Sequence, residues 1–170
     1  MVASESADTT VKAPTDKKPV KVNLPKTRKI VVDTEACGGC LTCEVVCSAR
    51  HFDGECNRFL SAIRIDADML DYFFTDYVCK QCKSASCAAS CKLDAIHFDN
   101  TTGAHFIDKD ICVKCGICVK ACPFAEAKYP LVRKEIFRGK PVIIKCDLCH
   151  GFADGPLCAA VCPKSAISVK

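Results

Sequence analysis

Most of the cysteines in the chain fall into four runs that share one spacing. Each run opens with Cys-x2-Cys and ends with x3-Cys, and only the interval between these two parts varies. Seventeen cysteines in 170 residues is a density that implies either disulfides or bound metal. The four runs are Cys37, Cys40, Cys43 and Cys47; Cys79, Cys82, Cys87 and Cys91; Cys112, Cys115, Cys118 and Cys122; and Cys146, Cys149, Cys158 and Cys162.

The redox compartment decides between disulfides and metal. The first thirty residues contain no apolar h-region and no twin arginine, so they do not resemble a secretion signal. No stretch approaches the roughly 18 consecutive apolar residues of a membrane span. We therefore expect a cytoplasmic chain without a membrane span, whose thiols stay reduced and bind metal.

The spacing within a run indicates which metal is bound. A zinc site usually takes two Cys-x2-Cys pairs from separate segments, whereas here Cys112, Cys115 and Cys118 crowd into one short loop. In the ferredoxin run C-x2-C-x2-C-x3-C-P the last cysteine binds the other cluster of a two-cluster module. Four such runs predict four [4Fe–4S] clusters. A zinc-bound interaction module and a disulfide framework are the alternatives.

The runs can pair in two ways. Sequential pairing joins the first run to the second and the third to the fourth, and nested pairing joins the first to the fourth and the second to the third. The second and third runs are linked by a short segment containing IHFDNTTGAHFID, which predicts a β-hairpin around Asn-Thr-Thr-Gly. No such hairpin is expected in residues 48–78, between the first and second runs, so local spacing favours nesting.

The segments around the runs predict short elements. KIVVD and VIIK are β-branched runs typical of strands, and the endings CAASC, CVKAC and CAAVC suit short helices. Gly38, Gly39 and Gly116 lie between ligands, where the backbone must approach sulfide closely. The fold class is therefore α+β. We expect the clusters to replace much of a conventional core.

Several other features have two interpretations or a minor role. Residues 1–29 hold prolines and lysines but no cysteine, so they form either a solvated tail or an extended arm bound to a partner. MLDYFFTDYV, residues 69–78, is either core packing or an interface patch. Cys56 belongs to no run and is expected to be a buried or free thiol. Four histidines are not expected to bind metal, because every run already has four thiols: His51, His97, His105 and His150.

Lysines flank the cysteine runs, and the formal net charge is +4. Thiolates on four oxidised clusters would bring the charge of the folded protein to about −4, so no nucleic-acid partner is inferred. Most of the flanking lysines are expected to be solvated, while the nearest would raise cluster potentials: Lys80, Lys83, Lys114, Lys120 and Lys145.

Two segments resemble a known family. KCDLCHGFADGPLCAAVCPKSAI is similar to the fourth run of the four-cluster iron–sulfur subunits, of polyferredoxin type, that serve molybdenum and tungsten oxidoreductases. CGGCLTCEVVCSARH followed by NRFLSAIRI resembles the branch that accompanies tungsten aldehyde oxidoreductases and tungsten-dependent benzoyl-CoA reductases. The resemblance covers residues 30–170. Ser48 and Lys92 depart from it, because a ferredoxin run carries proline at those positions.

The resemblance implies an architecture and a nested ligand assignment. It implies two ferredoxin-like two-cluster modules within residues 30–170: an outer module of residues 30–65 plus 141–170, and an inner module of about residues 72–128. The N-terminal arm, residues 1–29, precedes them. The implied ligands are Cys37, Cys40, Cys43 and Cys162 for cluster one; Cys47, Cys146, Cys149 and Cys158 for cluster two; Cys79, Cys82, Cys87 and Cys122 for cluster three; and Cys91, Cys112, Cys115 and Cys118 for cluster four.

The function expected from these features is electron transfer without catalysis. The sequence contains no glycine-rich nucleotide fingerprint and no pterin-binding pattern. The resemblance implies a subunit that relays single electrons between a tungsten- or molybdenum-pterin catalytic subunit and another redox partner, such as a flavoprotein or a ferredoxin. A free-standing polyferredoxin is the alternative.

Overall fold

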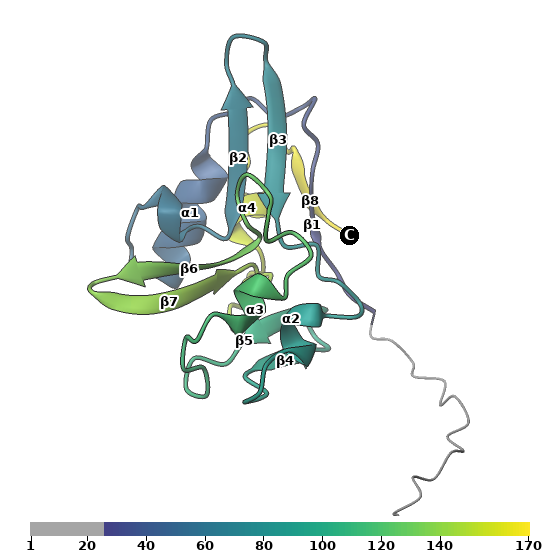
Figure 1. Ribbon diagram of the computed structural model, residues 1–170. Helices are drawn as coiled ribbons and strands as arrows, with labels where there is room; N and C mark the ends of the chain where they lie inside the picture. Colours follow the sequence, from purple (N-terminus) through teal and green to yellow (C-terminus); the bar gives the residue numbers. More distant parts are fainter. Residues whose placement is uncertain (1–25) are drawn as a thin grey trace, which may run out of the picture.

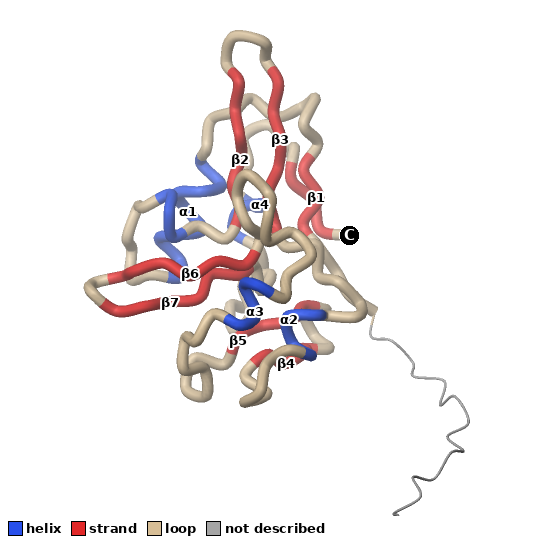
Figure 2. Tube along the Cα trace, in the orientation of Figure 1, coloured by secondary structure: helices blue, strands red, loops and turns tan. Residues whose placement is uncertain are grey.

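The computed structural model describes residues 26–170 and consists of short strands and helices joined by loops (Figures 1 and 2). The four helices within this range are α1 (Thr42–His51), α2 (Ser86–Ala89), α3 (Ile117–Lys120) and α4 (Leu157–Ala160), and a 3-10 turn, η1, spans Arg58–Leu60. The strands are β1 (Ile30–Val32), β2 (Ile63–Asp68), β3 (Phe73–Val78), β4 (Ile96–Asp99), β5 (Ala104–Ile107), β6 (Val132–Phe137), β7 (Lys140–Lys145) and β8 (Ile167–Val169).

The strands form four antiparallel two-stranded sheets, and one of them joins the two ends of the described chain. Strand β1 pairs with β8, with Ile30 opposite Val169 and Val32 opposite Ile167 (Figure 1). The other three sheets are hairpins made by consecutive strands, β2–β3, β4–β5 and β6–β7. Helix α1 packs against α4, and α2 packs against α3. The first and last parts of the described chain therefore lie together, with the middle part beside them.

The predicted β4–β5 hairpin is confirmed, and its turn explains the sequence Asp-Asn-Thr-Thr-Gly. The Asp99 carboxylate accepts hydrogen bonds from the backbone N–H groups of Thr101, at 2.8 Å, and Thr102, at 3.2 Å. Gly103 then adopts the left-handed conformation, with φ of 71°. An acidic residue that caps its own turn and a glycine that supplies positive φ together reverse the chain. The predicted helices at CAASC, CVKAC and CAAVC also form, as α2, α3 and α4.

The expectation of no hairpin between the first and second runs was wrong. Strands β2 and β3 pair over six residues each and project at the top of Figure 1. Their buried side chains follow the strand period, with Ile63 and Ile65 on β2 and Phe74 and Val78 on β3 all less than 7% exposed. The aromatic composition of residues 69–78 concealed this alternation.

The core-packing interpretation of residues 69–78 is confirmed for part of the segment, and the interface patch stays a prediction. Phe74 and Val78 pack in the core, whereas the residues at the tip of the hairpin are exposed. Leu70 is 92% exposed and Tyr72 is 77% exposed. The boundary between core and surface therefore falls inside this segment, close to the turn.

The apolar core is arranged around cysteines. One cluster joins Ile30, Ile63, Ile65 and other buried residues, and Cys43 and Cys158 belong to it. A second cluster places Ile96 and Val132 against Cys118. Apolar side chains therefore surround the thiols.

Most of the predicted arm, residues 1–25, lies outside the described residues. The described part of the arm is held by backbone hydrogen bonds. The N–H of Arg28 donates to the carbonyl of Gly103 and the N–H of Lys29 donates to the carbonyl of Lys170, both at 2.7 Å.

Within residues 26–170, no helix has the length and apolar character that a bilayer crossing requires.

We predict that Gly39→Ala destabilises the chain more than Gly139→Ala does. Both glycines have positive φ, 64° and 75°, so both substitutions carry the left-handed cost of about 1–2 kcal/mol. At Gly39 an added Cβ would also lie 2.5 Å from Phe74 Cε1, whereas at Gly139 no atom lies within 4 Å. Overpacking adds about 1–3 kcal/mol. The measurement is the denaturant midpoint of the two variants by circular dichroism, and equal midpoints would contradict the prediction.

Candidate metal centres

The four cysteine runs meet at four cavities, each lined by four cysteines. Every cavity combines three cysteines of one run with the last cysteine of another, and the runs combine first with fourth and second with third. Cavity one contains Cys37, Cys40, Cys43 and Cys162; cavity two Cys47, Cys146, Cys149 and Cys158; cavity three Cys79, Cys82, Cys87 and Cys122; and cavity four Cys91, Cys112, Cys115 and Cys118.

The packing of helices in pairs explains why the last cysteine of a run faces a different cavity. Cys43 and Cys47 lie one turn apart on α1, so they point along the same face of the helix toward two successive positions. The packed helix α4 contains Cys158, and Cys162 follows its end. Cys43 meets Cys162 and Cys47 meets Cys158, so the two helices run in opposite directions.

The second pair of helices repeats this arrangement. Helix α2 contains Cys87, and Cys91 follows its end; helix α3 contains Cys118, and Cys122 follows its end. Cys87 meets Cys122, and Cys91 meets Cys118. Each antiparallel helix pair therefore serves two cavities and exchanges one cysteine in each direction.

The open space within the cavities is similar in three of the four. Counted with the space open to solvent, cavities one, two and three contain about 370, 350 and 360 Å³ between their atoms. The same volume is about 750 Å³ for cavity four, because it continues into a surface lined by Leu93, Val113 and Ile117, which are all exposed. Four identical donor sets, three of them in cavities of near-equal size, are what four copies of one group would require.

Every Cys-x2-Cys loop has the same unusual backbone at the residue before its second cysteine. Gly39 has φ of 64°, and the matching residues of the other runs also have positive φ: Gln81, at 48°, Lys114, at 58°, and Leu148, at 56°. Three of these four are not glycine, and such residues seldom adopt this conformation. The loops thus share a strained turn that brings both cysteines of the pair to one cavity.

Burial makes the thiols poor acids on their own. It raises the pKa of Cys43 and of Cys158 to about 12 and that of Cys118 to about 11. Neighbouring cysteines add to the shift, because several thiolates in one cavity would repel one another. Thiolates at these positions need a cationic centre, so the donor sets fit iron–sulfur clusters.

Backbone amides support two thiols in matching positions. Ala62 N–H donates to Cys47 Sγ and Ala95 N–H donates to Cys91 Sγ, each at 3.3 Å. Both cysteines are the last of their runs, and both lie in the cavity of a different run. Hydrogen bonds to sulfur stabilise negative charge there and are one of the factors that set cluster potentials.

His51 and Cys56, which the sequence does not predict to bind metal, have other surroundings in the structure. His51 lines cavity two, but its ring nitrogens contact the Cys47 carbonyl oxygen, at 3.0 Å, and Asp147 Oδ1, at 3.2 Å. Although burial opposes it, the hydrogen bond that His51 donates to Asp147 raises the pKa of His51 to about 11. Cys56 is exposed and lies in none of the four cavities.

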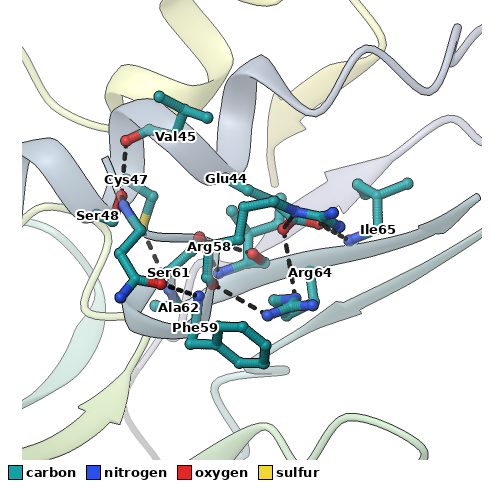
Figure 3. A network of polar contacts seen from close by, with 12 residues as sticks. Glu44, Val45, Cys47, Ser48, Arg58, Phe59, Ser61, Ala62, Arg64 and Ile65 are labelled. Carbon is teal, nitrogen blue, oxygen red and sulfur yellow. Dashed lines mark hydrogen bonds and ion pairs between the residues drawn. The ribbon is translucent and has the colours of Figure 1, made fainter. Parts of the chain in front are cut away.

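A buried carboxylate between two ligands of α1 is a feature that the sequence did not reveal. Glu44 is fully buried, and its oxygens accept from Ile65 N–H and from Arg58 Nε, both at 2.7 Å (Figure 3). Arg64 Nε lies 3.3 Å from the same carboxylate as an ion pair without hydrogen-bond geometry. Glu44 therefore joins the helix of Cys43 and Cys47 to β2.

Two other buried polar residues, Gln81 and Lys145, were also missed. Gln81 gives no signal in the sequence, because a single glutamine between two cysteines belongs to no motif. In the sequence Lys145 resembles the other lysines that flank the runs. In the structure it is only 9% exposed, whereas Lys83 and Lys120 lie on the surface. Both residues line cavity three.

Comparison with protein families gives a match to the 4Fe-4S dicluster domain over residues 70–170. Electron transport protein HydN of Escherichia coli (strain K12) is 34% identical over 154 residues, which cover 82% of this chain and 86% of the relative. The polyferredoxin-like subunit of aliphatic sulfonate oxidoreductase from Pyrococcus furiosus is 32% identical over 133 residues, covering 78% of this chain and 70% of the relative.

A solved structure also aligns with the chain. It is the active site complex BamBC of benzoyl coenzyme A reductase with benzoyl-CoA. The alignment covers 85% of this chain and 79% of the matched chain, with 26% identity and a TM-score of 0.47.

We predict that Glu44→Gln lowers the free energy of unfolding by about 3–5 kcal/mol, because it leaves a buried arginine without its counter-charge. The matched control is Asp53→Asn, which breaks the exposed ion pair of Asp53 with Arg138, 3.1 Å apart, and is expected to have little effect. Chaotrope titration of the iron-loaded protein measures both. A Glu44→Gln variant as stable as the control would show that the network contributes little.

Proposed function

The chain belongs to the 4Fe-4S dicluster domain family, and on that premise we propose that it holds four [4Fe–4S] clusters and relays single electrons for a separate oxidoreductase. It is an iron–sulfur electron-transport protein and not itself an enzyme, in line with relatives named as an electron transport protein and a polyferredoxin-like subunit. The presence of [4Fe–4S] clusters follows from the family. Their number and their ligands are our proposal.

The observation that carries the proposal is the meeting of four cysteines at each of four cavities. We assign cluster one to cavity one, cluster two to cavity two, cluster three to cavity three and cluster four to cavity four. The nested architecture, with an outer and an inner two-cluster module, is supported by the β1–β8 pairing and by the packing of α1 on α4 and α2 on α3.

When bound, [4Fe–4S] clusters supply one-electron carriers whose potentials depend on hydrogen bonds, charge and solvent exposure. The chain's own residues provide these conditions. The thiols hold the site, the left-handed loops orient them, and apolar neighbours such as Ile65 and Val132 exclude water. Amides of Ala62 and Ala95 stabilise negative charge on sulfur.

The order of the cavities supports a relay with two ends. Cavities one and two share α1 and α4, and cavities three and four share α2 and α3. Gln81, from the loop of cavity three, donates to the carbonyl of Cys146, a residue of cavity two, at 2.7 Å. We infer an order of one, two, three and four, with partners at the first and last positions.

The proposed partners are a tungsten- or molybdenum-pterin catalytic subunit and a second redox protein, either a flavoprotein or a ferredoxin. The name of the sulfonate oxidoreductase relative, a polyferredoxin-like subunit, favours assembly with a catalytic subunit. We propose that the complex works in the cytoplasm, where thiols remain reduced. Purification of the untagged chain from its host tests this, because a stable catalytic companion is expected, and isolation of the chain alone would favour a free polyferredoxin.

We predict about sixteen iron and sixteen sulfide per chain after anaerobic purification.

Cys162→Ala should disturb only the cluster in cavity one, because Cys162 meets Cys37, Cys40 and Cys43 there. Iron should fall to between about twelve and fifteen per chain, since a cluster with three thiolates loses iron or is lost. Iron and sulfide analysis with electron paramagnetic resonance gives the measurement.

The matched control is Cys56→Ala, which removes a thiol that lies outside the four cavities and should leave iron content unchanged. Wild-type iron near eight, or zinc in its place, would overturn the four-cluster proposal. Damage to the cluster at Cys112, Cys115 and Cys118 by the Cys162 substitution would overturn nested pairing.

A further inference from the structure

A buried polar contact joins the two halves of the protein between cavities two and three. It consists of Gln81 and Lys145, which are 2% and 9% exposed. Gln81 lies in the loop between Cys79 and Cys82 of cavity three, and Lys145 directly precedes Cys146 of cavity two. The contact is therefore the place where the proposed relay passes from the outer to the inner pair of cavities.

Each polar atom at the ends of these two side chains has at least one hydrogen-bond partner. Lys145 Nζ donates to Gln81 Oε1, at 3.2 Å, to the carbonyl oxygen of His105, at 2.5 Å, and to the carbonyl oxygen of Cys146, at 3.0 Å. Gln81 Oε1 also accepts from His105 N–H, at 3.0 Å, and Gln81 Nε2 donates to the Cys146 carbonyl, at 2.7 Å. Three acceptors around one nitrogen match the three donors of an ammonium group, whereas a neutral amine has two.

The ammonium group has no carboxylate partner among residues 26–170, where none lies within 4.0 Å of it. The nearest acidic residue along the chain, Asp147, contacts His51 instead, at 3.2 Å. A buried positive charge is costly unless a negative charge compensates it. Negative charge near it comes from the thiolates of cavity three, which Lys145 lines, and at longer range from Asp147.

We propose that Lys145, held in place by Gln81, is the residue that sets the potential of the cluster in cavity three. The inference rests on the proposed function. Reduction at cavity three would add one electron and one negative charge, which Lys145 would stabilise from its position against that cavity. Lys145 lines cavity three but not cavity two, so its effect falls mainly on one cluster of the four. This cluster becomes the electron-accepting side of the junction.

A second lysine beside cavity three distinguishes the proposed role of Lys145 from the effect of any nearby positive charge. Lys80 also lines cavity three and flanks Cys79, but its side chain is 37% exposed and pairs with Asp76, at 2.9 Å. Water and the carboxylate screen its charge. Lys80→Gln therefore removes the same formal charge beside the same cavity and serves as the matched control.

The experiment is a redox titration of the iron-loaded full-length protein, followed by electron paramagnetic resonance. In Lys145→Met, one of the four one-electron steps should move to lower potential, with at least a tenfold fall in the ratio of reduced to oxidised cluster at a fixed potential, about 59 mV for one electron. The step that moves should be the one that Cys87→Ala removes. Lys80→Gln should change no step by more than about twofold, about 18 mV on the same scale.

Lys145→Gln keeps a polar side chain and provides a second neutral variant if Lys145→Met does not load iron. If a neutral variant binds as much iron as the wild type and its four redox steps are all unmoved, or all moved alike, this inference is overturned while the proposed function stands. Loss of iron in both neutral variants would overturn it too, because Lys145 would then be a structural residue. A wild-type chain without clusters would instead overturn the proposed function on which the inference depends.

Discussion

The structure depends on the burial of sulfur in four small spaces, each of which must contain four thiols. Burial alone keeps such thiols protonated, since it raises the pKa of Cys43 and Cys158 to about 12. A positive centre in each cavity changes this balance, because it attracts the thiolates that repel one another. The apolar residues then pack against the thiols and the groups they bind, so Ile30, Ile63 and Val78 share a core with cysteines. Binding energy and folding energy are coupled for this reason.

The exchange of cysteines between runs follows from helix geometry and determines the path of the chain. Two cysteines four residues apart point along one face of a helix toward successive positions. When two such helices pack in opposite directions, each supplies one thiol to the cavity of the other, as Cys43 with Cys162 and Cys47 with Cys158 illustrate. The partner of the first run is the last run, so the ends of the domain must meet, and the β1–β8 ladder is where they do.

The sequence was sufficient for features that local spacing controls and insufficient for those that arise from tertiary contact. Cysteine intervals, the Asn-Thr-Thr-Gly turn and the small-residue helices could be recognised directly. The β2–β3 hairpin was missed because the alternation of Ile63 and Ile65 is short and Phe73, which is exposed, adjoins the buried Phe74. Gln81 could not be identified as a bridge, because its partners Cys146 and His105 are distant in sequence and only folding brings them together.

Two of the buried charged groups among the described residues, Glu44 and Lys145, are balanced in different ways, and the difference affects how the halves of the protein are joined. Glu44 is compensated by Arg58 and Arg64 within the outer part of the chain, so that network is complete whatever the cavities contain. Lys145 has hydrogen-bond acceptors but no carboxylate within 4.0 Å among the described residues, so the thiolates of cavity three and, at longer range, Asp147 supply its counter-charge. Without thiolates in cavity three, the compensation of this buried positive charge is reduced. The outer part therefore has an internal source of stability, whereas the contact between the halves is strengthened when cavity three holds thiolates.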